Sequence, residues 1–171
     1  MVSFHVTFDL PNNVRLRDGE EQLTICMNET VEKVGSLNTT TVHDLSLQYK
    51  EASKPVDRDY IHDRLRAEYM TIIATFPAAQ YAVANLFAKM KETNPENELL
   101  LAVVKKSIMI RCRCKTVEAL YDLEELINSA ELDQHFSDIM YCLVREPVKA
   151  SVSMSHEDFI RCRMSLTGGA G

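Results

Sequence analysis

The chain has 171 residues, of which 46% are hydrophobic and 26% are charged, and its formal net charge is −6. This composition is that of a globular protein with a core, and the negative charge provides no general attraction to nucleic acid or anionic lipid. No apolar run approaches the roughly 20 residues of a membrane-spanning helix, and the N-terminus lacks a signal-peptide pattern. We therefore expect a cytoplasmic protein that does not enter a membrane.

The N-terminal third contains one clear strand and several ambiguous segments. Val2–Leu10 alternates apolar and polar residues, which predicts a half-buried strand. Leu23–Met27 fits a short second strand, whereas the adjacent Asn28–Thr30 can instead open a helix, so both interpretations stay open. We expect a polar loop over Gly35–Thr41 and a short helix over Val42–Tyr49.

Two amphipathic helices are expected in the middle of the chain, after a linker at Ser53–Asp57. The first should cover Tyr60–Phe76 and end at Pro77, and the second should cover Ala78–Lys91, before a break at Asn94–Asn97. Their expected apolar sides contain Tyr60, Ile61, Leu65, Tyr69, Ile72, Ile73 and Phe76 in the first helix, and Tyr81, Val83, Leu86, Phe87 and Met90 in the second.

The clearest pattern is a strand that leads directly into a helix. Leu99–Val104 precedes it and fits a buried strand or a helical turn. Ser107–Lys115 alternates, and its two faces carry Ile108, Ile110, Cys112 and Cys114 on one side and Met109, Arg111, Arg113 and Lys115 on the other. Val117–Ile127 then has the spacing of an amphipathic helix, for which Thr116 is a suitable N-cap.

The C-terminal part continues with a helix, a strand and a helix. The spacing of apolar residues predicts a helix over Glu131–Tyr141, and Val148–Met154 alternates as a strand. A capping-box-like sequence beginning at Ser155 predicts a last helix over His156–Leu166. We expect residues 168–171 to form a disordered tail.

These elements predict a single α+β domain over residues 1–171. A mixed or antiparallel sheet should contain the strands at Val2–Leu10, Ser107–Lys115 and Val148–Met154, with the five later helices on one side of it. The chain can also be divided into an N-terminal strand with a helical part at 1–94 and a second part at 95–167.

Five cysteines are an odd count without a signal peptide, which favours reduced thiols in the cytosol. They are Cys26, Cys112, Cys114, Cys142 and Cys162. The Cys112-x-Cys114 pair lacks the Cys-x₂₋₄-Cys spacing and the second ligand pair of a zinc site. Because both thiols share a face with Ile108 and Ile110, we interpret them as core residues.

A basic row follows the outer face of the Ser107–Lys115 strand. It comprises Arg111, Arg113 and Lys115, with Lys105 and Lys106 just before the strand. Such a row can bind an anionic partner, or it can protect an exposed strand from aggregation. No aromatic residue is interleaved with it, so nucleic acid is the less favoured partner.

The remaining polar residues form no catalytic or cofactor-binding signature. The five histidines are scattered, and His62, Asp63, Arg58, Arg64 and Arg66 are expected on a solvated helix face. There is no phosphate-binding glycine loop and no Gly-x-Ser-x-Gly sequence. We therefore expect no metal, no cofactor and no enzymatic activity.

The sequence from Leu99 to about Leu166 resembles the N-terminal domain of TRADD-type adaptors, in versions found in invertebrate immune and cell-death proteins. The similarity lies in Ser107–Cys114, Thr116–Leu123 and Ser129–Leu132, and in the later run Glu157–Met164. It implies a ferredoxin-like two-layer α+β sandwich without catalysis, which acts by binding another protein. The sequence has no death-domain pattern, and the first ninety-odd residues resemble no known family.

The prediction for function is a non-enzymatic adaptor or regulatory domain in immune or cell-death signalling. Its partner would be another protein, and a homo-oligomer is compatible with the sequence. Two alternatives stay open. One is a small cytosolic thiol-dependent enzyme centred on Cys112, Cys114, Cys142 or Cys162, and the other is a nucleic-acid-binding module that uses the basic strand at 105–115.

Overall fold

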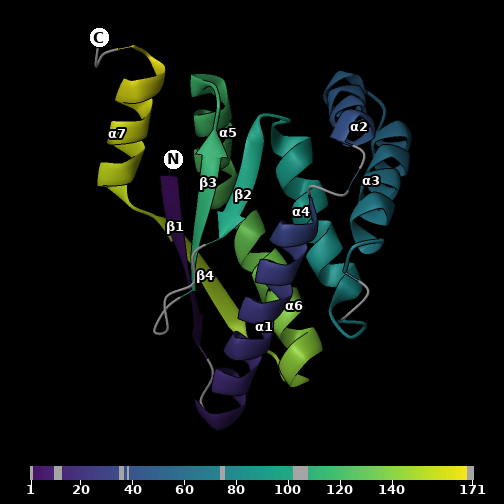
Figure 1. The fold of residues 1–171 in the computed structure, drawn as a ribbon, viewed down its shortest axis with the longest axis vertical. Coiled ribbons are helices and arrows are strands. Elements are labelled where there is room, and N and C mark those ends of the chain that lie inside the picture. Colours follow the sequence, from purple (N-terminus) through teal and green to yellow (C-terminus); the bar gives the residue numbers. More distant parts are fainter. Residues whose placement is uncertain are drawn as a thin grey trace.

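A computed structural model describes residues 2–9, 13–34, 37, 39–73, 76–101 and 108–168, with backbone alone at 13–17, 100 and 101. The strands are β1 (Val2–Asp9), β2 (Asn97–Leu101), β3 (Ile108–Cys114) and β4 (Lys149–Met154). The helices are α1 (Asn13–Lys33), α2 (Thr39–Glu51), α3 (Pro55–Met70), α4 (Gln80–Thr93), α5 (Val117–Asn128), α6 (Glu131–Val144) and α7 (His156–Leu166) (Figure 1). Lys105, Lys106 and the expected tail beyond Gly168 lie outside the described residues.

The four strands form one antiparallel sheet in the order β2-β3-β1-β4. Phe4, in the central strand β1, pairs with Ile110 on one side and with Met154 on the other. The expected α+β class and the three expected strands are confirmed, and the start of Leu99–Val104 belongs to a fourth strand. Because β1 pairs with β3 and β4, the two ends of the chain share one sheet.

One face of the sheet packs on helices, and the opposite face is polar. The buried inner side chains are Val2, Phe4 and Val6 of β1, Ile108, Ile110, Cys112 and Cys114 of β3, and Ala150 of β4. Strand alternation turns the intervening residues outward, and those of β3 and β4 include the exposed Arg111, Arg113, Ser151 and Ser153. An antiparallel sheet tolerates this arrangement because only one of its faces needs to be buried.

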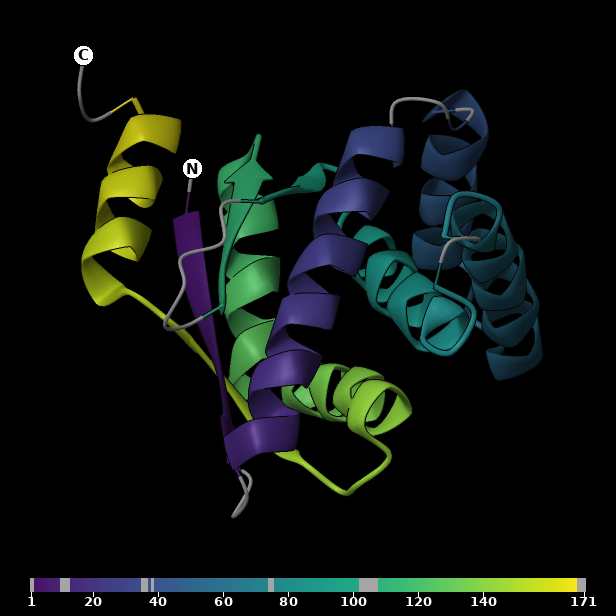
Figure 2. The ribbon, with the colours of Figure 1, turned by 60° about the horizontal axis from the view of Figure 1, so that its bottom comes forward.

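The helices are stacked behind the sheet, at increasing distance from the strands (Figure 2). Helices α5 and α6 pack on the sheet, and α1 packs against α6 and β2. Helix α4 lies against α5 and α6, and α2 and α3 pack on α4 from the outside. The expectation that the helix around residues 60–76 covers the sheet is therefore wrong, because α4 separates α3 from the strands. Helix α7 contacts α5 and β1, and its Phe159 ring lies 5.9 Å from that of Tyr121.

Local capping chemistry agrees with the sequence in the C-terminal half. The hydroxyl of Thr116 accepts a hydrogen bond from the Ala119 N–H at 3.0 Å, as expected for an N-cap of α5. The hydroxyl of Ser155 accepts one from the Asp158 N–H at 3.4 Å at the start of α7. Both expected caps are confirmed.

The N-terminal half differs from the sequence prediction in several boundaries. The segment Leu23–Met27 lies inside α1, where Leu23, Cys26, Met27 and Thr30 are buried at helical spacing, so the strand interpretation is wrong. The expected loop is shortened because α2 begins at Thr39. Helix α3 begins at Pro55, which favours the first helical turn, and it ends at Met70, before Pro77.

Two tyrosines expected in the core are exposed instead. Tyr60 is 64% exposed and Tyr81 is 55% exposed. The guanidinium of Arg66 lies 4.4 Å from the centre of the Tyr81 ring, a cation–π contact at the surface. The helical spacing placed both tyrosines on the apolar side, because each directly precedes a buried residue, Ile61 or Ala82.

Replacement of Gly19 tests the close packing of α1 on α6. A Cβ atom at this buried position would lie 2.9 Å from Met140 Cε and would also meet Val144 Cγ1. We expect Gly19→Ala to lower the free energy of unfolding by about 1–2 kcal/mol through overpacking, despite the gain of about 1 kcal/mol in helix propensity. Urea unfolding measures the change. The exposed Asn28→Ala in the same helix should be neutral or stabilising, and equal stability of Gly19→Ala and the wild type would contradict this packing.

Candidate functional site

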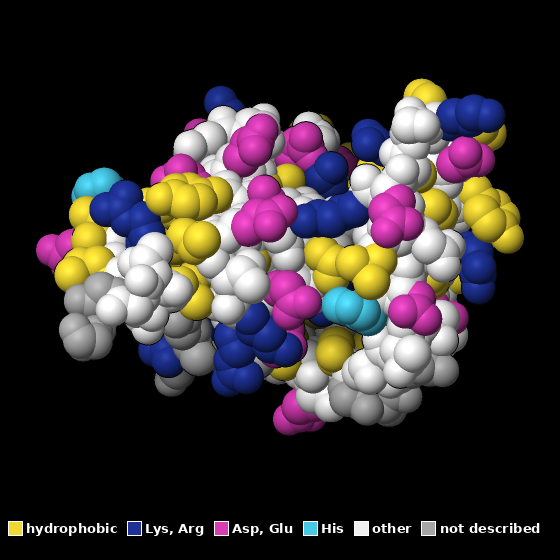
Figure 3. Space-filling model, turned by 90° about the horizontal axis from the view of Figure 1, so that it is seen from above, with side chains coloured by type: hydrophobic (Ala, Val, Ile, Leu, Met, Phe, Trp, Pro, Cys, Tyr) yellow, Lys and Arg dark blue, Asp and Glu magenta, His cyan; other side chains and the backbone are white. Residues whose placement is uncertain are grey.

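One candidate site is a cavity of about 510 Å³ between helices and the edge of the sheet. It lies where the C-terminal part of α1 and the first turn of α2 meet α4 and β2, at the end of the molecule seen in Figure 3. Its apolar wall includes Val31, Val42, Tyr69, Phe87, Met90 and Leu99. A volume of this size and an apolar wall with a few polar groups are typical of small-molecule sites.

Two lysines line the same cavity in different electrostatic situations. Lys115 forms an ion pair with Glu98 at 2.9 Å. Lys91 is half-buried, and its ammonium donates a hydrogen bond to the Pro95 carbonyl at 3.1 Å. No carboxylate of the described residues lies within 4 Å of Lys91. Burial lowers the pKa of Lys91, while the negative charge of Glu98 acts in the opposite direction.

Asn97 provides a further polar group beside the cavity. It is 1% exposed, and its side-chain amide donates to the Ala119 carbonyl at 3.2 Å. Its Oδ1 atom is buried and has no hydrogen-bond partner among the described residues. A buried acceptor without a partner has a cost in free energy.

A second polar cluster joins α3 to α4. The Nδ1 atom of His62 contacts the Glu92 carboxylate, and its Nε2 atom lies 3.1 Å from Asn85 Oδ1. Glu92 is only 5% exposed, so the expectation that His62 belongs to a solvated face is wrong. Hydrogen bonding to Glu92 is the main cause that raises the pKa of His62, and burial acts against it.

The His62 cluster suits a structural bridge better than proton transfer. Both ring nitrogens face oxygen atoms, which satisfies a protonated imidazolium and leaves neither nitrogen free for a substrate. Nearby His135 differs, because burial is the main cause that lowers its pKa, followed by the charge of Lys89. The ammonium of Lys89 forms an ion pair with Glu131 at 2.7 Å, which ties α4 to α6.

The two thiols that the sequence predicted in the core lie there. Cys112 and Cys114 are buried on the inner face of β3. Their mutual hydrogen bond raises the pKa of Cys112, with burial as the second cause, and lowers the pKa of Cys114. Burial raises the pKa of Cys26 to about 11 and is the main cause that raises the pKa of Cys162. Within the described part of the chain, no three His, Cys, Asp or Glu residues gather as metal ligands would.

The basic row is exposed but partly neutralised. Glu98 of β2 lies 2.9 Å from Lys115 and 3.9 Å from Arg113. Arg111 is exposed, and it has no ion pair or hydrogen bond with the described side chains. Of the expected row, the structure therefore places Arg111 and Arg113 on β3 and Lys115 directly after it. Glu98 offsets part of the charge of Arg113 and Lys115, and Arg111 has no ion pair among the described residues.

Comparison with known proteins gives no relative. No protein-family model, curated protein or solved structure matches the chain. The resemblance to TRADD-type domains therefore stays a prediction. The helices of the described residues include none that is long and apolar enough to cross a membrane.

The His62–Glu92 contact predicts a pH-dependent contribution to stability. Because the folded pKa of His62 is raised above 6.5, the protonated pair stabilises the fold fully below that value and loses this contribution as pH rises through the folded pKa. We expect His62→Gln to be destabilised by about 1–2 kcal/mol at about pH 5.5 and by less at about pH 8.5. Urea unfolding across this range measures the difference between the variant and the wild type.

The control for this prediction is His156→Gln, because His156 is exposed on α7. Its difference from the wild type should stay near zero at every pH. Any pH dependence from His135 has the opposite sign, and its two largest causes, burial and Lys89, are present in both the variant and the wild type. A His62→Gln effect that is constant with pH would contradict a titrating bridge.

The burial of the thiols predicts selective labelling. Cys142 is half-buried and the other four cysteines are buried, so we expect about one of the five thiols to react rapidly with a thiol reagent in the folded protein. All five should react after unfolding, and Cys142→Ser should remove the fast reaction. Fast labelling of Cys112 or Cys114 in the folded protein would instead favour the thiol-dependent enzyme.

Proposed function

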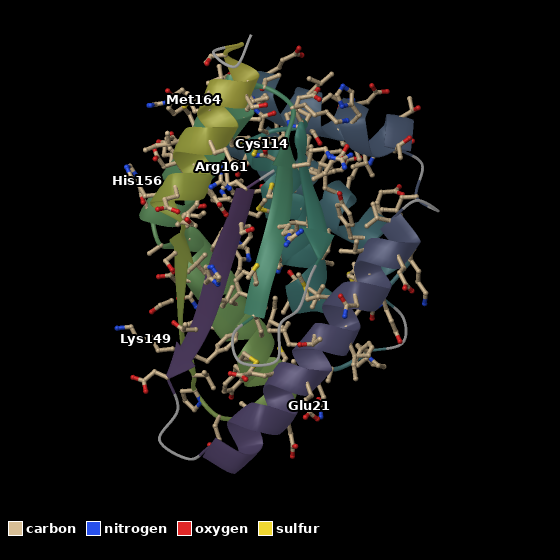
Figure 4. All side chains as sticks on the ribbon, turned by 60° about the vertical axis from the view of Figure 1, so that its left-hand side comes forward. Glu21, Cys114, Lys149, His156, Arg161 and Met164 are labelled. Carbon is tan, nitrogen blue, oxygen red and sulfur yellow. The ribbon has the colours of Figure 1, made fainter. Side chains whose placement is uncertain are left out.

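We propose that this chain is a non-enzymatic protein-interaction domain that binds an acidic segment of a partner protein on the polar face of its sheet. The observation that carries this proposal is the exposed Arg111 on a sheet face that no described helix covers. Figure 4 looks onto this side of the sheet, with the strands in front of α5. We call this surface the open face and define it by the outward residues of β1, β3 and β4.

The cross-strand pairs give the open face its chemistry. Arg111 stands opposite Ser3 of β1. In the next pairs, His5 lies between Met109 and Ser153, and Thr7 lies opposite Ser151. The neighbours of Arg111 on β1 are thus short or neutral side chains, and Arg111 itself is exposed. Arginine and methionine are enriched in protein interfaces, and a guanidinium binds a carboxylate through two parallel hydrogen bonds.

The edge of the sheet at β4 is less suited to a partner. The Ala150 N–H donates to Ser137 Oγ at 3.0 Å, and the Val152 N–H donates to Asp133 Oδ1 at 2.9 Å. These side chains of α6 occupy backbone donors that an added strand would need. The face of the sheet, and not this edge, is therefore the surface that we assign to the partner.

The strand order supports a finer assignment of the fold. In a ferredoxin-like β-α-β-β-α-β sandwich, each crossover connection joins two strands that flank a third. The order β2-β3-β1-β4, with helices between β1 and β2 and between β3 and β4, is compatible with that scheme. In this proposal α1–α4 replace the first crossover helix. The TRADD-type role in immune or cell-death signalling, and the cytoplasmic location, belong to the same proposal.

The two alternatives have less support. A thiol-dependent enzyme needs an accessible thiolate, whereas Cys112 and Cys114 are buried and the His62 ring nitrogens already have partners. A nucleic-acid-binding face usually offers aromatic side chains for stacking, and the described outward residues of β1, β3 and β4 include none. Because β3 carries basic residues, the experiment below also tests binding of nucleic acid.

Charge reversal on the open face tests the proposed function. We expect Arg111→Glu to reduce recovery of crosslinked protein partners from the source cell by about tenfold or more, because the charge-assisted hydrogen bonds would become repulsive. Quantitative mass spectrometry after crosslinking and co-purification measures the recovery. Arg64→Glu provides the same charge change at an exposed position of α3, distant in the fold from the sheet, and should retain the partners.

Two results would contradict the proposed function. The first is recovery of the same partners at the same level by Arg111→Glu and the wild type. The second is a salt-sensitive gel shift of single- or double-stranded nucleic acid that Arg111→Glu abolishes, which would favour the nucleic-acid-binding alternative.

A further inference from the structure

The cavity between α1, α2, α4 and β2 has room and lining for a ligand with an apolar body. Its volume of about 510 Å³ lies within the usual range for small-molecule sites. Tyr69 and Phe87 form part of its wall, with their ring centres 5.4 Å apart, and Met90 lies on the same helix as Phe87. Aromatic and methionine side chains adapt well to an aliphatic or aromatic surface.

Charged groups of both signs line the polar part of the same cavity, namely Lys91 and Lys115 with Glu96 and Glu98. Thr39, Thr40 and His43 line it from the N-terminal turns of α2, whose first turn contains no acidic residue. A helix N-terminus carries partial positive charge, which stabilises an anion. Lys91 lines the cavity as well and adds a full charge. Glu98 is engaged by Lys115, so the first turn of α2 and Lys91 are the two groups of the lining that a bound anion can contact.

The two lysines of the cavity differ in what they can offer to a ligand. Lys115 is held by Glu98 at 2.9 Å. Lys91 uses one of its three N–H donors on the Pro95 carbonyl and has no carboxylate partner among the described residues. A half-buried ammonium without a counter-ion is costly, and burial accordingly lowers the pKa of Lys91. A bound anion would supply the missing partner.

We propose that this cavity binds a small amphipathic carboxylate, whose carboxylate contacts Lys91 and the first turn of α2 and whose apolar body packs on Tyr69, Phe87 and Met90. A medium-chain fatty acid is the simplest molecule of this class. Binding in this cavity is independent of the proposed protein partner on the open face.

The first experiment compares three probes that share one apolar chain. Dodecanoate, dodecanol and dodecylamine are titrated into the whole protein by isothermal calorimetry. We expect dodecanoate to bind at least about tenfold more tightly than the other two, because only a carboxylate pairs with Lys91. In parallel, the NMR signals of the eight methionine methyl groups show where the probe binds. The Met90 signal, assigned with Met90→Leu, should shift most.

Matched variants then locate the charge. Lys91→Met keeps the length and the apolar stem of the side chain but removes its charge, and should weaken dodecanoate binding by about tenfold. Lys149→Met makes the same change at an exposed position of β4 that does not line the cavity (Figure 4), and should bind as the wild type does. Thr40→Trp, at an exposed rim position, should hinder entry and weaken dodecanoate binding without touching Lys91.

Each outcome supports or overturns the carboxylate site. Thermal unfolding of every variant tests whether the protein is folded. If Lys91→Met does not fold, the site is tested by dodecanoate binding to Thr40→Trp, and undiminished binding by that variant would overturn the site. Absence of heat and of methyl shifts with dodecanoate up to about 1 mM would overturn the site. Equal binding of dodecylamine, or equal binding by folded Lys91→Met and the wild type, would overturn the assignment of a carboxylate. None of these results depends on whether Arg111 binds a protein.

Discussion

Helix α4 is enclosed by other elements on most of its surface, and its polar side chains must therefore find partners inside the protein. It contacts α2, α3, α5, α6 and β2. Glu92 pairs with His62 of α3, Lys89 pairs with Glu131 of α6, and Lys91 turns to the Pro95 carbonyl beside the cavity. Breaking the His62–Glu92 pair would leave an uncompensated charge on the buried Glu92, so this contact restricts how α3 can be placed against α4.

The sequence predicted the elements whose pattern is local. Strands β1, β3 and β4 alternate without interruption, and α5 and α7 carry their own caps at Thr116 and Ser155, so no distant contact was needed to place them. The segment Leu23–Met27 was wrongly predicted to be a possible strand, because a short apolar run is too short to show a helical or a strand period. In the structure the rest of α1 decides its conformation, through contacts with α6 that are remote in sequence.

The candidate sites were less predictable than the fold, for a related reason. The partner of His62 is 30 residues away in sequence, and only the packing of α3 on α4 brings Glu92 to it. One signal was present: Asn85, Lys89 and Glu92 recur at helical spacing on a helix whose other positions are mostly apolar. The cavity had no such signal, since its wall combines residues of α1, α2, α3, α4 and β2 that share no pattern.

Glu98 connects the two surfaces to which we assign binding. Its side chain lines the cavity, and it also pairs with Lys115 and lies 3.9 Å from Arg113 on the strand of the open face. This one carboxylate offsets part of the positive charge of Lys115 and Arg113, whereas Lys91 and Arg111 have no ion pair among the described residues. Because interactions between exposed charges weaken beyond a Debye length of about 8–10 Å, each remaining charge acts mainly on what lies next to it. Glu98 thus separates a basic region into two local sites, an enclosed one suited to a small anion and an open one suited to a larger acidic surface.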